Sequence, residues 1–159
     1  MSSCQKPVAG SQLPASLQPP SLPRPLVAAL LNPAPPPMPD SSTTLADLRS
    51  LVRQFVDERD WRQFHAPKNL SMSLAIEAAE LMEHFQWIDA AESRQAAGDA
   101  QRLAPIREEL ADVLCYVLAL ANELEIDLST AVMDKMAKNA LKYPAEQSRG
   151  RYAPPGGTG

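Results

Sequence analysis

The sequence contains little cysteine, glycine and aromatic residue, and it has no long apolar run. Its two cysteines, Cys4 and Cys115, suit neither a disulfide framework nor a thiolate metal site, so we expect a reducing compartment, the cytoplasm. No stretch of about 18 apolar residues occurs, so no transmembrane helix is expected. Prolines interrupt the apolar segments near the N-terminus, and we therefore expect no signal peptide.

Aromatic residues make up 5% of the chain, while alanine and leucine dominate its later part. This composition favours helices over sheet. The net charge of −4 argues against a nucleic-acid backbone as the main partner. A small anionic ligand stays open, because a bound metal ion reverses the local sign of the charge.

Proline is abundant only at the start, where residues 1–40 hold eleven of the sixteen prolines. Proline removes backbone donors and blocks helices, so we predict a disordered segment there. Translation beginning at Met38 is an alternative explanation of this segment. Residues 41–143 are predicted to form one all-α domain, and residues 144–159 a flexible tail.

Four helices are predicted within that domain. The first begins at a cap among residues 42–44, where Thr44 and Asp47 form a box-like pair, and ends near Arg59. The second is capped by Asn69 and ends near Trp87. The third starts at Pro105 and ends near residue 123, and the fourth runs from residue 127 or 129 to residue 143.

The second and third helices each carry a pair of acids beside an apolar stripe. Glu77 and Glu80 are three residues apart, as are Glu109 and Asp112. The stripes comprise Leu74, Ala78, Leu81, Phe85 and Ile88 in the second helix, and Ile106, Leu110, Val113 or Leu114, Val117 and Ala121 in the third. Packing these helices together would gather four carboxylates, which a hard cation such as Mg²⁺ or Mn²⁺ would stabilise. The alternative is that the acids only solvate the helix surfaces.

Large rings and basic side chains flank the acidic pairs in the sequence. Trp61 and Phe64 lie on the connector between the first two helices, where they either fasten the loop to the bundle or wall a pocket for a planar base. Lys135, Asn139 and Lys142 share one face of the fourth helix. They are either a solvated stripe or contacts for phosphate groups. Cys115 is expected to be a buried structural thiol.

Taken in order, these motifs resemble a known family. The spacing E-x-x-E, 28 residues, E-x-x-D is similar to that of the MazG-like superfamily of all-α nucleotide pyrophosphohydrolases. The words ERDWRQFHAPKNL, FQW, REELADVLCY and KMAKNALKYP resemble the dCTP pyrophosphatase branch of that superfamily. The resemblance covers residues 45–152.

The resemblance implies an oligomeric, four-helix bundle-like fold, commonly a tetramer built as a dimer of dimers. It implies Mg²⁺-dependent hydrolysis of a deoxynucleoside triphosphate, dCTP or a modified dCTP, to the monophosphate and pyrophosphate. Metal ligands would be Glu77, Glu80, Glu109 and Asp112, with Glu80 and Glu77 as catalytic residues. Substrate-binding positions implied by the resemblance are Trp61, Trp87, Tyr116, Lys135, Asn139 and Tyr143.

Some residues depart from the family's pattern. Ile76 and Ala79 stand where the family usually has glycine before each acid, and Val52 replaces a histidine of the animal members. The base preference therefore stays open. Two other functions remain as alternatives, a non-enzymatic helical interaction module and a phosphoribosyl-ATP pyrophosphohydrolase-like enzyme.

Overall fold

The computed structural model describes residues 39–150, and all regular structure in that range is helical. The all-α prediction is confirmed for this range. The Pro-rich segment and its alternative start at Met38, together with residues 151–159 of the predicted tail, lie outside the described residues.

Helix α2 runs from Leu45 to Glu58 and begins as the sequence predicts. The Thr44 hydroxyl accepts a hydrogen bond from the Asp47 amide at 3.1 Å, and the Asp47 carboxylate accepts one from the Thr44 amide at 2.9 Å. This capping box satisfies two amides that the first turn leaves without helical partners. The predicted end of the helix near Arg59 is also confirmed, since Arg59 is its C-cap.

A short connector turns the chain from α2 into the next helix. Asp60 takes a left-handed conformation with φ 51°, and the 3₁₀ turn η2 spans Arg62–Phe64. Helix α3, Pro67–Glu83, starts two residues before the predicted cap. The prediction of Asn69 as the cap is wrong, because Pro67 occupies the first helical position, which needs no amide donor. The Asn69 side chain donates instead to the Phe64 carbonyl oxygen at 3.0 Å.

The segment between α3 and the next long helix is partly helical. It forms α4, Ala90–Ser93, and the 3₁₀ turn η3, Ala96–Gly98, before α5, Ala100–Glu123. The predicted start of this helix at Pro105 is wrong. Asp99 is the cap, with its carboxylate accepting from the amides of Gln101 and Arg102, and Pro105 therefore lies inside the helix.

The C-terminal part of the described chain contains two helices. Helix α6, Leu128–Lys142, is capped by Asp127, whose carboxylate accepts from the Thr130 amide at 2.7 Å. It ends before Pro144, as predicted. A short α7, Ala145–Ser148, follows within the predicted tail.

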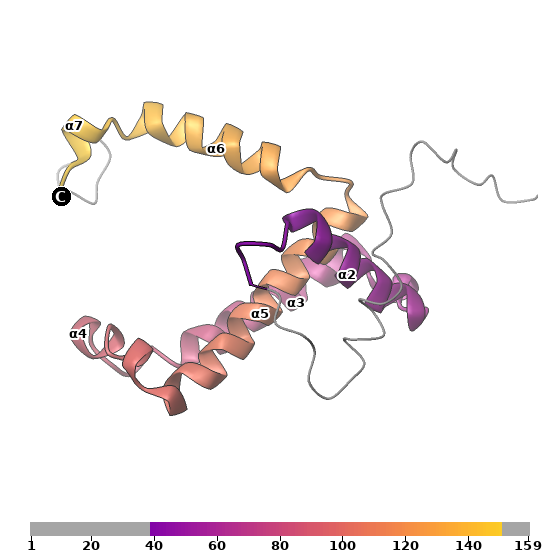
Figure 1. Ribbon diagram of the computed structural model, residues 1–159, viewed down its shortest axis with the longest axis horizontal. Helices are drawn as coiled ribbons and strands as arrows, with labels where there is room; N and C mark the ends of the chain where they lie inside the picture. Colours follow the sequence, from indigo (N-terminus) through magenta and orange to yellow (C-terminus); the bar gives the residue numbers. More distant parts are fainter. Residues whose placement is uncertain (1–38, 151–159) are drawn as a thin grey trace, which may run out of the picture. The chain divides into compact units, whose positions relative to one another are not determined.

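Helix α5 lies against both α3 and α2 (Figure 1) and carries three of the six buried residues of the described chain. The core of this contact consists of Val56, Leu70, Leu118, Ala119 and Ala121. Two members of the predicted apolar stripes, Ala78 and Leu110, are exposed, Leu110 by 56%. The core of one chain is therefore smaller than its apolar content would allow, and α6 contributes no buried side chain.

The prediction that Cys115 is a buried residue is wrong, because it is exposed on α5. Partial desolvation and the charge of Asp112 nevertheless raise the pKa of this thiol, which keeps it protonated at neutral pH. Within residues 39–150, no helix combines the length and hydropathy that crossing a bilayer requires.

Candidate metal centre

Three carboxylates from two helices converge where α3 and α5 pack. Glu77 comes from α3, and Glu109 and Asp112 come from one turn of α5. One carboxylate oxygen of each lies within 4.8 Å of the other two. The i, i+3 spacing on α5 places both of its acids on the side that faces Glu77. Three hard oxygen donors at this separation are a donor set suited to a divalent cation.

The electrostatics of the group follow from its geometry. Partial burial is the largest cause that raises the pKa of Glu77, and the charges of Glu80, Asp112 and Glu109 raise it further. Both causes disfavour an ionised carboxylate at this position. A cation among the three oxygens would reverse that preference, because it offsets the repulsion between them.

Glu80 is the predicted acid that the structure does not bring into this group. It is exposed on α3, one turn after Glu77, and its charge is close enough to affect the Glu77 carboxylate. Its carboxylate is thus near that of Glu77 but outside the close group of three.

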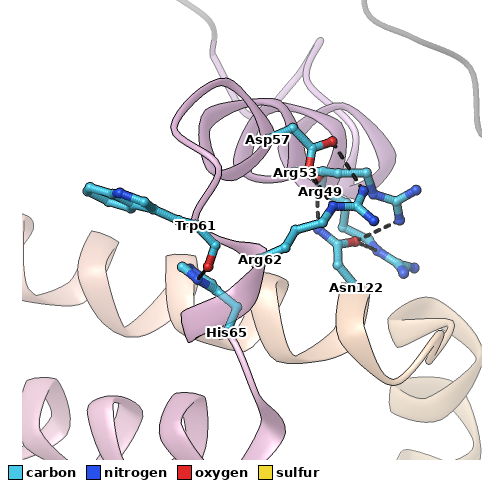
Figure 2. Close-up of polar contacts among 7 residues, drawn as sticks. All are labelled: Arg49, Arg53, Asp57, Trp61, Arg62, His65 and Asn122. Atoms are coloured by element: carbon cyan, nitrogen blue, oxygen red, sulfur yellow. Dashed lines mark hydrogen bonds and ion pairs between the residues drawn. The ribbon is translucent and has the colours of Figure 1, made fainter. Parts of the chain in front are cut away.

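The predicted aromatic residue Trp61 lies on the connector after α2. Its ring meets Phe55 edge to face, with centroids 5.7 Å apart, and the Arg59 guanidinium lies 3.7 Å from the Phe55 centroid. The Nδ1 atom of His65 lies 2.7 Å from the Trp61 carbonyl oxygen (Figure 2). The connector is fastened by these contacts, and Trp61 is still 43% exposed. Both alternatives for this ring, a fastener and a stacking surface, are therefore compatible with its position.

The other predicted substrate residues are spread over three elements. Trp87 follows α3 and is 87% exposed, Tyr116 lies one turn after Asp112 on α5, and Lys135 and Asn139 lie on α6, with Tyr143 as its C-cap. Within residues 39–150, none of them forms a hydrogen bond or ion pair with the three acids. Because Trp87 buries so little of its ring, it is available for contact with another molecule.

Helices α2 and α5 also meet at a polar junction that the sequence alone does not predict. Arg49 and Arg53 both donate to the Oδ1 atom of Asn122, at 3.0 and 3.3 Å (Figure 2). The Asn122 amide in turn donates to the Arg49 carbonyl oxygen at 3.0 Å. The signals that could have indicated this junction were an asparagine directly after the apolar run of residues 117–121 and two arginines four residues apart.

Comparisons with known proteins find similar sequences and a similar fold. The model of the MazG-like family matches residues 72–152. A dCTP pyrophosphatase 1 from Rattus norvegicus is 47% identical over 107 residues, which are 67% of this chain and 63% of that protein. The dCTP pyrophosphatase 1 of Homo sapiens is 44% identical over 106 residues, with 67% and 62% covered. The chain thus spans less than two thirds of the length of these curated relatives.

A solved structure is similar as well. The crystal structure of a pyrophosphatase from Archaeoglobus fulgidus has 43% sequence identity and a TM-score of 0.58, and it matches over 62% of this chain and 90% of that one. The residues that the family model matches, 72–152, include α5 with its acidic pair and most of α3. The chain belongs to the MazG-like family.

Proposed function

We propose that this chain is a nucleoside triphosphate pyrophosphohydrolase that converts a deoxynucleoside triphosphate, dCTP or a modified dCTP, into the monophosphate and pyrophosphate. The observation that carries the proposal is the convergence of Glu77, Glu109 and Asp112 within 4.8 Å on two packed helices. The names of the relatives, dCTP pyrophosphatase and pyrophosphatase, support the reaction and the base. Removal of excess or modified nucleotides is the proposed role, in the cytoplasm.

The proposed cofactor is Mg²⁺, with Mn²⁺ as a substitute. The donor set fits such a cation, because it consists of carboxylate oxygens and includes a carboxyl group whose pKa is raised by burial and like charge. Glu77, Glu109 and Asp112 would hold the ion, with Glu80 as the fourth ligand or as a neighbour. When bound, the ion neutralises phosphate oxygens and lowers the pKa of a coordinated water.

The chain's own contribution to the reaction is proton transfer and positioning. Glu80 is the proposed general base, because its exposed carboxylate is near that of Glu77 without joining the close group of three acids. Glu83 on α3 and Glu108 on α5 are the alternative bases. A carboxylate in this role takes the proton of the attacking water as the bond from phosphorus to the leaving pyrophosphate breaks.

The remaining site residues are proposed to bind the nucleotide. Exposed rings of Trp61 and Trp87 offer faces on which a base can stack, and Tyr116 lies on the same helix as the acidic pair. Lys135, Asn139 and Tyr143 of α6 are the proposed contacts to phosphate or base. A lysine there would balance the charge of a triphosphate.

We further propose that the working form is a homo-oligomer, a tetramer arranged as a dimer of dimers. Large apolar side chains are exposed on α6, including Leu141 at 84% and Met133 at 71%. Leu110 and Leu114 are also exposed on α5. Contact with other copies would remove this apolar surface from water and bring α6 residues to the acids of a neighbour.

The test is pyrophosphate release from a panel of deoxynucleoside triphosphates, with Mg²⁺ and with EDTA. We expect release that needs Mg²⁺ and is fastest with dCTP or a modified dCTP. Glu80→Gln should lower kcat by about 10²–10⁴ if Glu80 is the base, whereas Glu83→Gln and the distant Glu58→Gln should not. Undiminished release in EDTA, or orthophosphate as the product, would contradict the proposal.

A further inference from the structure

The junction of α2 and α5 holds two arginines around one neutral side chain. Arg49 Nε and one terminal nitrogen of Arg53 donate to the same Asn122 oxygen, at 3.0 and 3.3 Å. Arg49 also donates to the Ala121 carbonyl oxygen at 3.2 Å. Figure 2 shows both guanidinium groups reaching toward the Asn122 amide. Two positive charges therefore converge within a partly buried junction on an acceptor without charge.

These two arginines differ from others in the described part of the chain. Arg62 is ion-paired with Asp57, and Arg102 with Glu92, whereas Arg49 and Arg53 have no carboxylate within 4.0 Å among residues 39–150. Two guanidinium groups carry ten N–H donors, of which three make hydrogen bonds to described residues. Most of the N–H donors at this point therefore make no hydrogen bond to a described residue.

A purely structural role accounts for one arginine only. Ala121 lies in the last turn of α5, where the helix dipole favours a cation, and its carbonyl oxygen accepts from Arg49 as well as from the Ile126 amide. The acid Asp127 at the start of α6 also attracts Arg49, since the charge of Arg49 contributes to lowering the pKa of that carboxyl group. Arg53 has neither compensation, and its one hydrogen bond goes to an amide that Arg49 already uses.

We propose that Arg49 and Arg53 bind a phosphate-type oxyanion at this junction. Guanidinium groups are weakly hydrated planar forks that match the oxygens of phosphate, and two of them supply the charge for a dianion. Asn122 holds both forks from the side of α5, which reduces the conformational entropy lost on binding. The site is formed by other residues than the acidic group of α3 and α5, and it binds an anion rather than a cation.

The first experiment measures stability in EDTA, where the acidic group has no cation and repels phosphate. Unfolding in urea is followed with inorganic phosphate and with sodium chloride at equal ionic strength. For a dissociation constant of about 1 mM, about 10 mM phosphate raises the folded-to-unfolded ratio about elevenfold. We expect this gain in the wild type and in Arg94→Gln, a variant of equal charge on the distant α4 segment. Arg53→Gln should reduce it below about twofold.

A second measurement keeps the proposal testable if Arg53→Gln folds poorly. Phosphate is titrated into the ¹⁵N-labelled wild type, and the Nε–Hε resonances of Arg49 and Arg53 are expected to shift together and saturate. Asn122→Asp, which places a carboxylate between the two forks, should abolish the shift. The proposal would be overturned if phosphate stabilised wild type and Arg53→Gln equally, or if the two arginine resonances did not shift.

Free phosphate and the phosphate group of a nucleotide are two sources of the same chemistry. Titration with dCMP, and with deoxycytidine as a control without phosphate, separates them. A shift of the two arginine resonances with inorganic phosphate alone supports a site for the free ion. A shift with dCMP as well, but not with deoxycytidine, supports a site that accepts nucleotide phosphates.

Discussion

Replacing Glu77 by glutamine is expected to make the metal-free protein more stable. The oxygens of Glu109 and Asp112 lie within 4.8 Å of the Glu77 oxygen. Two unit charges about 4 Å apart in water repel by about 1 kcal/mol, so the two neighbours together cost about 2 kcal/mol at this separation in water. Screening at physiological salt, with a Debye length of about 8 Å, reduces this to about 1 kcal/mol. Glutamine keeps the shape of the side chain and removes the charge.

The raised pKa of Glu77 makes the free energy of unfolding depend on pH. Because burial and three neighbouring acids raise the pKa of Glu77, the folded state holds that proton to a higher pH than the unfolded state does. Between the two pKa values the folded state binds more protons, and the free energy of unfolding falls as the pH rises. Above the folded-state pKa this decrease in the free energy of unfolding is complete. The Glu77→Gln variant has no carboxyl group at this position, so we expect it not to show the decrease.

Urea unfolding in EDTA, from about pH 4 to about pH 7, measures both effects. The gain of Glu77→Gln should be greatest at the upper end of this range and should shrink as salt is added. Glu58→Gln is the control, since Glu58 is an exposed acid outside the group. A Glu77→Gln variant less stable than the wild type near pH 7, or an unchanged pH slope, would refute the argument from like-charge repulsion.

Three further predictions concern residues outside the acidic group. Asn122→Ala should lower the free energy of unfolding by about 2–3 kcal/mol in urea, because three hydrogen bonds are lost and two involve charged donors. A loss below about 0.5 kcal/mol would mean that water replaces them. Asp60→Gly should be neutral or stabilising and Asp60→Val destabilising by about 1–3 kcal/mol in thermal unfolding, because φ is 51°. Thr44→Ala should cost about 1 kcal/mol at neutral pH. The hydrogen bonds from Thr44 lower the pKa of Asp47, so part of the stability difference between wild type and Thr44→Ala should vanish as the pH falls through the folded-state pKa of Asp47. An equal loss of stability at acid and neutral pH would contradict this coupling.

The helices could be predicted from local rules, and the errors came where two local rules compete. Thr44 and Asp47 interact within one turn, so their cap was predictable without knowledge of the fold. At the start of α3, Asn69 and Pro67 both suit a helix beginning, and the proline determines it. At the start of α5 the same preference for proline at the first turn gives the wrong start, Pro105, because Asp99 caps the helix six residues earlier.

The candidate site was predictable only in part. Spacing within each helix placed Glu109 beside Asp112, and the apolar stripes implied that α3 and α5 pack, which brings Glu77 to them. The position of Glu80 depends on the rotation of α3 about its own axis. The stripe on α3 does not fix this rotation, as the exposure of Ala78 indicates. The Asn122 junction joins residues about seventy positions apart, and no local rule pairs them.

The proline inside α5 affects how far fraying of that helix reaches toward the candidate metal centre. Pro105 has no amide proton, so the helical hydrogen bond that would join it to residue 101 cannot form. The turn at Ala100–Ala104 is therefore joined less cooperatively to the rest of α5. In hydrogen exchange this turn should open by itself, with fast exchange, while the amides around Glu109 and Asp112 stay protected. Glu109 lies four residues beyond the break, so local opening at the exposed start of the helix leaves the spacing of its acids intact.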